Sequence, residues 1–129
     1  MKTIIVCDAI HKVGFEILNR EEDIKVIDAV NVPKDKLLDI LGEADVAITR
    51  SSTEVGEAFL NAAKNLKALV RAGVGVDNVD IDGCSKRGII AMNVPTANTI
   101  AAVELTMAHM LAAARSFPYA HNDLKIDRI

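Results

Sequence analysis

Short apolar segments alternate with segments of helical periodicity over most of this chain. Residues 3–7 and 66–70 are mostly apolar runs, with the length and composition typical of a buried strand. Between such runs, apolar side chains recur three or four positions apart, as at Ile10, Val13 and Ile17. That spacing places them on one face of an α-helix. Strands that alternate with helices predict βαβ units, and therefore a parallel sheet covered by helices.

Five strands and five helices are expected from this pattern. The strands are predicted at residues 3–7, 24–27, 45–49, 66–70 and 89–92, and the helices at residues 10–18, 33–41, 59–63, 79–86 and 99–116. Gly42 and Gly88 follow two of these helices, where glycine commonly ends a helix. Five strands favour a flavodoxin-like α/β fold with the strand order 2-1-3-4-5, because that order is common among doubly wound sheets.

A glycine-rich segment, residues 71–78 and called the glycine loop below, directly follows the fourth predicted strand. Its sequence is Arg-Ala-Gly-Val-Gly-Val-Asp-Asn. Ligands of open α/β sheets bind at the carboxyl ends of strands, and glycine lets the backbone approach a ligand closely. The N–H groups of Gly73, Val74 and Gly75 could therefore hold an anionic group. The loop ends in Asn78 and so departs from the G-x-G-x-x-G dinucleotide fingerprint, which favours a substrate loop over a cofactor loop.

Two arginines mark the same predicted edge of the sheet. Arg50 follows the third strand and precedes Ser51, and Arg71 ends the fourth strand. Parallel strands end at one edge, and neighbouring strands lie ~5 Å apart. The two guanidinium groups could therefore converge on one phosphate or carboxylate, which the planar fork of arginine suits. The alternative is that both arginines form surface ion pairs with nearby acidic side chains, namely Glu54, Asp77 and Asp80.

The sequence does not indicate a metal site. Asp8 follows the first strand, as a metal-binding acid of a receiver domain would. Such a domain also needs an aspartate after its third strand and a lysine after its fifth, where this chain has Arg50 and Asn93. Residues 8–11 also lack the composition of a flavodoxin phosphate loop. The three histidines are scattered, and no Ser-His-Asp or Cys-His arrangement is readable.

The composition excludes several classes of partner. The net charge of −3 and the aromatic content of 3% leave neither a basic face nor a stacking surface for nucleic acid. No apolar run approaches the ~20 residues that span a bilayer, and we expect no targeting segment before the first strand. Cys7 and Cys84 are isolated, which fits a reducing compartment. We expect a cytoplasmic protein that binds neither nucleic acid nor membrane.

The last predicted helix is apolar around nearly its whole circumference. Residues 99–116 include a run of aliphatic residues, methionines and alanines with few charges between them. Such a helix needs burial on more than one side, which a single small sheet domain does not provide. Residues 117–129 are mixed and weakly patterned. We therefore expect this helix to meet a further domain or a second copy of the chain, and a homo-oligomer in solution.

Together these segments resemble the N-terminal region of the D-isomer-specific 2-hydroxyacid dehydrogenases, over essentially the whole chain. The resemblance is carried by residues 50–51, 69–80, 88–95 and 102–105. The glycine loop followed by Asn-x-Asp is specific to this superfamily. The pair formed by Arg50 and Arg71 is most similar to the family members that oxidise 3-phosphoglycerate, in which arginines at these points bind the substrate phosphate.

The resemblance implies an enzyme divided into two domains. Residues 1–97 would form a flavodoxin-like substrate-binding domain. Residues 98–129 would form a long inter-domain helix and the start of an NAD-binding domain that this chain lacks. The family's dinucleotide fingerprint and its catalytic arginine, glutamate and histidine are not found in these residues. The resemblance therefore implies that the 129-residue chain contains no catalytic residue and is inactive alone.

The resemblance also assigns roles to the residues of the sheet edge. Arg50, Ser51 and Arg71 would bind the substrate phosphate. The amides of the glycine loop, those of Val74 and Gly75, would hold the substrate carboxylate, and Val74 would also lie near the nicotinamide of NAD. Two alternatives stay open, a glyoxylate or hydroxypyruvate reductase of the same family and a stand-alone domain that binds a small anion.

Overall fold

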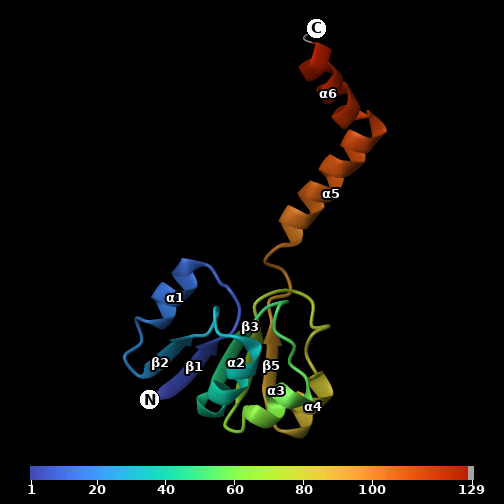
Figure 1. Ribbon diagram of the computed structural model, residues 1–129. Coiled ribbons are helices and arrows are strands. Elements are labelled where there is room, and N and C mark those ends of the chain that lie inside the picture. The colour runs from blue at the N-terminus through green and yellow to red at the C-terminus, as the bar shows by residue number, and fades with distance from the viewer. Residues whose placement is uncertain (128–129) are drawn as a thin grey trace. The chain divides into compact units, whose positions relative to one another are not determined.

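The computed structural model describes residues 1–127 and contains one parallel sheet with helices around it (Figure 1). The sheet is built from β1 (Lys2–Val6), β2 (Ile24–Asp28), β3 (Val46–Thr49), β4 (Ala68–Arg71) and β5 (Ile90–Asn93). The strand order is β2-β1-β3-β4-β5, and every neighbouring pair is parallel. The predicted α/β fold and its strand order are confirmed.

The helices of the first part of the chain are short. They are α1 (Lys12–Leu18), α2 (Lys34–Ile40), α3 (Glu57–Ala62) and α4 (Ile81–Lys86), with a 3₁₀ turn, η1 (Leu41–Glu43), after α2. The start of α4 was predicted two residues too early, because Asp80 is its cap: its Oδ1 accepts from the N–H of Gly83 at 2.8 Å. Gly88 ends this helix with φ of +67°, a backbone angle that favours glycine.

The main hydrophobic core lies between one face of the sheet and three helices, α2, α3 and α4. Right-handed crossovers place these helices together, because the chain moves in the same direction across the sheet from β2 to β5. The step from β1 to β2 runs the other way, so α1 belongs to the opposite face. The strands and helices contribute the buried side chains Ile5, Ala47, Leu69, Leu37, Phe59, Leu60 and Cys84.

The opposite face of the sheet is less covered. Two apolar rows cross it in register, Ile4–Val46–Ala68–Ile90 and Val6–Ile48–Val70–Met92. Exposure rises along both rows from β1 to β5: Val6 is fully buried, whereas Ile90 is 63% exposed and Met92 is 46% exposed. α1 itself buries none of its residues completely.

The chain divides into two compact units between Pro95 and Thr96. The second unit contains α5 (Thr99–Ala114) and α6 (Phe117–Asp127), separated by Ser116, which has φ of +49°. The long predicted helix is therefore present as α5, but the weakly patterned segment after it is helical as far as residue 127. Its last two residues, Arg128 and Ile129, lie outside the described residues.

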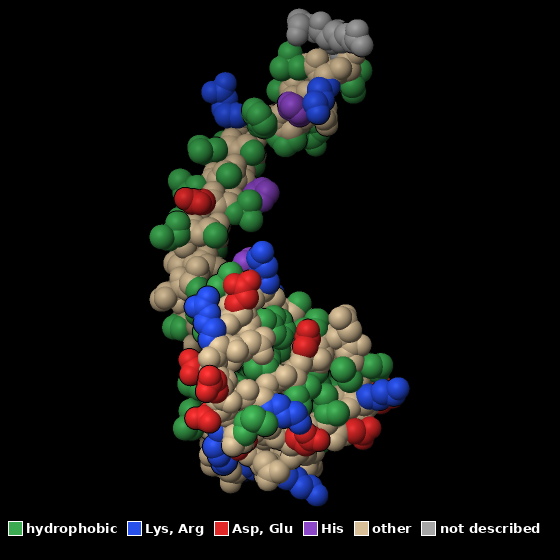
Figure 2. Space-filling view, turned by 90° about the vertical axis from the view of Figure 1, so that its left-hand side faces the viewer, with side chains coloured by type: hydrophobic (Ala, Val, Ile, Leu, Met, Phe, Trp, Pro, Cys, Tyr) green, Lys and Arg blue, Asp and Glu red, His purple; other side chains and the backbone are tan. Residues whose placement is uncertain are grey.

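Apolar side chains are distributed along the whole of α5 (Figure 2). No residue of α5 is buried, and Ile100, Leu105 and Leu111 are 74%, 59% and 64% exposed. Within the described part of its own unit, α5 contacts only α6, and this contact leaves its apolar side chains exposed. Within residues 1–127, no helix combines the length and the apolar character needed to cross a bilayer.

Candidate functional site

Two loops meet at the carboxyl edge of the sheet. Residues 50–53, called the Arg50 turn below, follow β3, and the glycine loop begins at the end of β4. Thr49 and Arg71 are partners in the β3–β4 register, so Arg50 lies one residue beyond the level of Arg71 on the neighbouring strand. The N–H of Ala72 donates to the carbonyl oxygen of Thr49 at 2.7 Å. The carboxyl edge thus brings together the two predicted loops, as parallel strands require.

The two arginine side chains follow different paths from this edge. Arg50 is exposed, and its Nη1 donates to the carbonyl oxygen of Ala9 at 3.1 Å, on the β1 side. The guanidinium of Arg71 lies over Gly73, and its buried Nε has no hydrogen-bond partner among residues 1–127. The expected convergence of the two guanidinium groups is therefore not seen. Arg71 is level with Thr49 and not with Arg50 in the sheet, and successive side chains of a strand point to opposite faces.

Neither arginine is neutralised by a carboxylate. The ion pairs among residues 1–127 involve Lys2, Lys25 and Lys67 but neither Arg50 nor Arg71. The surface ion pairs considered as the alternative are therefore not formed in the described part of the chain. Both positive charges are left available for an anionic ligand.

The backbone of the glycine loop offers two free donors rather than three. The N–H of Gly73, which was also expected to hold an anion, donates to the carbonyl oxygen of Arg71 at 2.8 Å and is engaged within the loop in this structure. The N–H groups of Val74 and Gly75 have no partner among the described residues. The carbonyl oxygen of Val74 is held by Nδ2 of Asn93 at 2.8 Å. A fixed peptide with free N–H groups is what an anion-binding loop needs.

The Arg50 turn is organised by Asp8, which the sequence pattern raised only as a possible metal ligand. The carboxylate of Asp8 accepts from the N–H groups of Arg50 and Thr53, and from Oγ1 of Thr53 at 2.8 Å. The N–H groups of Ser51 and Ser52 keep no partner among the described residues, and both residues are exposed. The position of Asp8 beside the Arg50 turn follows from the register of β1 and β3. Val6 pairs with Ile48, so the chain two residues further on places Asp8 opposite Arg50.

Comparison with known proteins identifies the family. The protein-family model described as "D-isomer specific 2-hydroxyacid dehydrogenase, catalytic domain" matches residues 4–123. The chain belongs to the D-isomer-specific 2-hydroxyacid dehydrogenase family. The resemblance carried by the glycine loop and the two arginines is confirmed.

Among curated 2-hydroxyacid dehydrogenases, this chain is 42% identical to the D-3-phosphoglycerate dehydrogenase of Methanocaldococcus jannaschii over 125 residues. That match covers 97% of this chain and 24% of the relative. A hydroxypyruvate reductase of Thermotoga maritima is 38% identical over 120 residues, which is 93% of this chain and 39% of the relative. The chain therefore spans only a quarter to two fifths of the length of these relatives.

A solved structure of the family has the same fold. The NAD⁺-bound 3-phosphoglycerate dehydrogenase of Entamoeba histolytica superposes with a TM-score of 0.71 and 28% identity. The match covers 86% of this chain and 38% of that structure. NAD is thus a cofactor within the family.

The cysteines of this 2-hydroxyacid dehydrogenase chain are not poised for chemistry. Burial raises the pKa of the Cys7 thiol to about 12, and the negative charge of Asp8 adds to the effect. Burial also raises the pKa of Cys84. Because the thiolate is the nucleophile, both residues are inert packing groups at neutral pH. Among residues 1–127, no three His, Cys, Asp or Glu side chains gather as a metal site.

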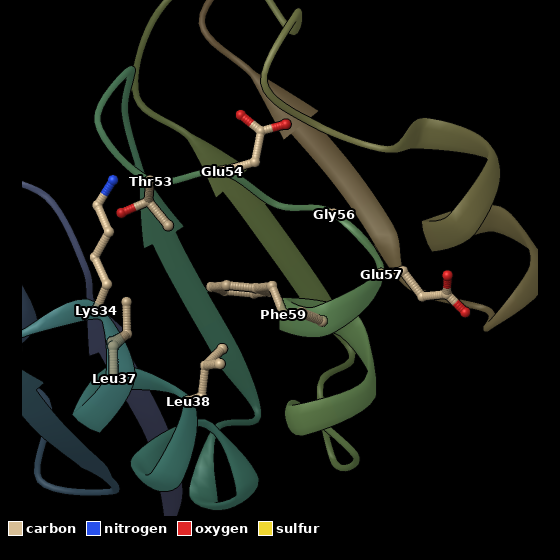
Figure 3. Close-up of a pocket in the computed structure, with 9 residues that line it drawn as sticks. Lys34, Leu37, Leu38, Thr53, Glu54, Gly56, Glu57 and Phe59 are labelled. Carbon is tan, nitrogen blue, oxygen red and sulfur yellow. The ribbon is translucent and has the colours of Figure 1, made fainter.

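Two cavities of similar size lie near the carboxyl edge. One, of about 290 Å³, lies between α2 and α3 (Figure 3). It includes Thr53, but neither arginine and no residue of the glycine loop. The other, of about 300 Å³, is bordered by Arg71, Val76, Val79 and Asn93. Arg71 and Val76 of the glycine loop line the second cavity, whereas Val74 and Gly75 do not.

Proposed function

We propose that this chain is the substrate-binding part of an NAD-dependent D-3-phosphoglycerate dehydrogenase. The reaction of the intact enzyme is the oxidation of 3-phosphoglycerate to 3-phosphohydroxypyruvate, a step of serine biosynthesis. In this assignment residues 1–97 form the substrate-binding domain and residues 98–129 lead into the NAD-binding domain. The identity to D-3-phosphoglycerate dehydrogenases over nearly the whole chain supports this assignment.

The observation that carries the proposal is the pairing of two anion-binding loops at one sheet edge. Arg50 offers an unneutralised guanidinium beside the free N–H and hydroxyl of Ser51. The free N–H groups of Val74 and Gly75 stand on the neighbouring loop. A substrate that carries a phosphate and a carboxylate needs two such groups of donors. The phosphate would be held at Arg50, Ser51 and Arg71, with the Arg71 side chain turning from its place over Gly73 toward Arg50, and the carboxylate would be held at the glycine loop.

The residues of this chain fit one contact to NAD and no more. Val74 is 40% exposed, and its carbonyl oxygen is fixed by Asn93, so a flat ring could lie against it. When bound, the nicotinamide supplies the hydride acceptor of the oxidation. The side chains at the edge of this sheet bind and orient the substrate. The proton acceptor and the dinucleotide fingerprint are not found among these 129 residues.

The test is a steady-state assay of the intact protein that contains this chain. We expect turnover of 3-phosphoglycerate with NAD⁺. In the Arg50→Ala variant we expect kcat/KM for 3-phosphoglycerate to fall by ~10- to 100-fold, which is the effect of losing one charge-assisted hydrogen bond. Activity of the same variant on unphosphorylated hydroxypyruvate should stay near the wild-type value. Equal losses on both substrates would contradict a phosphate-binding role for Arg50.

A second candidate is a hydroxypyruvate reductase, favoured by the 38% identity to the Thermotoga maritima enzyme. It predicts a larger kcat/KM for hydroxypyruvate or glyoxylate than for 3-phosphoglycerate, with little effect of Arg50→Ala. The same assay separates the two candidates. In either case the 129-residue chain alone should show no turnover, because hydride transfer needs a bound nicotinamide and a proton acceptor together. Turnover by the chain alone would contradict this.

A further inference from the structure

Asp8 is almost completely buried at the carboxyl end of β1. It is 7% exposed, and Thr53, which faces it, is 8% exposed. One carboxylate oxygen accepts from the N–H groups of Arg50 and Thr53, and the other accepts from the hydroxyl of Thr53. A buried carboxylate is costly unless its oxygens are hydrogen-bonded. Three donors from one turn offset that cost and fix the turn at both ends.

Asn78 holds the same turn from the opposite side. Its Nδ2 donates to the carbonyl oxygens of Arg50 and Thr53, both at 2.6 Å. Its own carbonyl oxygen accepts from the N–H of Val55 at 2.8 Å. Asn78 is the last residue of the glycine loop. The Arg50 turn is therefore tied to β1 by Asp8 and to the glycine loop by Asn78.

These ties leave the charged end of Arg50 untouched. No ion pair links Asp8 to the Arg50 guanidinium, whose Nη1 donates to Ala9 instead. Asp8 and Asn78 use the backbone groups of Arg50 and Thr53. The N–H groups of Ser51 and Ser52 have no partner in the part of the chain that the structure describes. The two side chains thus set where the turn lies without occupying its ligand-binding groups.

We propose that Asp8 and Asn78 are positioning residues, which hold the Arg50 turn against the glycine loop so that both loops contact the same ligand. This proposal rests on the proposed function, because the ligand in question is a small molecule with a phosphate and a carboxylate. Asp8 and Asn78 do not touch that ligand. They act through the backbone of residues 50 and 53.

Amide hydrogen exchange of the 129-residue chain tests the ties without any ligand. In Asp8→Ala, the amides of Arg50 and Thr53 should exchange at least about tenfold faster, because they lose their acceptor. The amides of Ile5 and Leu69 in the central strands should keep their wild-type rates. Asp82→Ala, at an exposed aspartate of α4 with no hydrogen bond in the described structure, is the matched control and should change neither set. Unchanged exchange at Arg50 and Thr53 in Asp8→Ala would overturn the proposal.

Ligand titration with 3-phosphoglycerate and inorganic phosphate tests the consequence. Asp8→Asn retains an oxygen for the two N–H groups, and its amide can donate to the Thr53 hydroxyl. We therefore expect its affinity to stay within about threefold of wild type, whereas Asp8→Ala should lose about tenfold. If Asp8→Asn loses as much as Asp8→Ala, the charge of Asp8 matters rather than its geometry, and the positioning role is wrong.

Asn78→Asp provides an independent variant with the same shape. It replaces two donated hydrogen bonds by a carboxylate that faces two carbonyl oxygens, so it should release the Arg50 turn and weaken binding at least as much as Asp8→Ala. Wild-type affinity in Asn78→Asp would contradict the proposal. If the wild-type chain binds neither probe, the proposed function fails, while the exchange measurement still decides whether Asp8 holds the turn.

Discussion

Glycine at position 73 leaves room for the side chain of Arg71. A Cβ at this position would overlap the guanidinium of Arg71, whereas the φ of Gly73 is not in the left-handed region. Gly88 is the opposite case, with open space around it and φ of +67°. One glycine therefore makes room at the candidate site, and the other ends a helix.

Substitution of each glycine by alanine should separate these two roles. In Gly73→Ala the displaced atoms are the far end of a flexible side chain, so we expect the free energy of unfolding to change by less than about 1 kcal/mol. Affinity for 3-phosphoglycerate should fall, since Arg71 must move. Gly88→Ala should destabilise by about 1 kcal/mol and leave affinity unchanged. Urea unfolding and ligand titration of both variants measure these effects, and the reverse pattern would contradict the two roles.

Asp45 predicts a pH dependence of stability. Hydrogen bonds from the Lys67 ammonium (2.6 Å) and the Thr3 N–H (3.0 Å), with Lys2 nearby, hold the pKa of this carboxyl well below its ordinary value of 3.8. A carboxyl whose pKa is depressed by folding stabilises the protein above its unfolded-state pKa, and this contribution is lost as the pH falls through the folded-state pKa.

We therefore expect Asp45→Asn to be less stable than wild type at pH 7, with a difference that shrinks below about pH 4. Urea unfolding at a series of pH values measures it. Asp39→Asn, at an exposed aspartate without an ion pair in the described structure, should track wild type throughout. If the free energy of unfolding of Asp45→Asn differed from that of wild type by the same amount at every pH, the titration of Asp45 would not be a source of the pH dependence.

At the level of elements, the two faces of the sheet differ in how they are covered. Leu69 on the α2–α4 face is 1% exposed, whereas Ile90 on the opposite face is 63% exposed. Leu69→Ala should cost ~2–5 kcal/mol, as large-to-small substitutions in a core do. Ile90→Ala should cost less than about 1 kcal/mol. Chemical denaturation of the two variants compares them, and equal costs would mean that another segment covers Ile90.

The periodic elements could be predicted from the sequence because their apolar spacing reflects burial on one or both sides. α6 could not, since its apolar residues do not form a stripe. Its start had a local signal that the pattern analysis missed: Ser116 is followed by Phe117 and Pro118, and proline suits the first turn of a helix. The carbonyl oxygen of Ser116 accepts from the N–H groups of Tyr119 and Ala120.

The candidate site was predictable in its location but not in its contacts. Arg50 and the glycine loop lie at strand ends, and parallel strands bring such ends together. The direction of each guanidinium and the bond that occupies the Gly73 N–H depend on local acceptors, which spacing does not show. The same is true of Asp8, whose partners are more than forty residues away in the sequence.

At the scale of the whole molecule, the apolar surface of α5 predicts self-association of the 129-residue chain. Exposed apolar side chains along a sixteen-residue helix exceed what soluble monomers usually present. Light scattering should show a mass that rises with concentration. A Leu105→Glu, Leu111→Glu double variant should lower that mass, whereas Lys64→Glu in the first unit should not. A monomeric mass at high concentration would contradict this prediction.

We propose that the carboxyl edge of this sheet binds a phosphorylated hydroxyacid through Arg50 and Arg71. Calorimetric titration of the chain with 3-phosphoglycerate tests it most directly, beside an Arg50→Ala, Arg71→Ala double variant. Arg20→Ala, at an exposed arginine far from this edge in the sequence, is the control for loss of positive charge. We expect saturable binding to wild type and to Arg20→Ala that disappears in the double variant. Binding of equal strength by the double variant would contradict it.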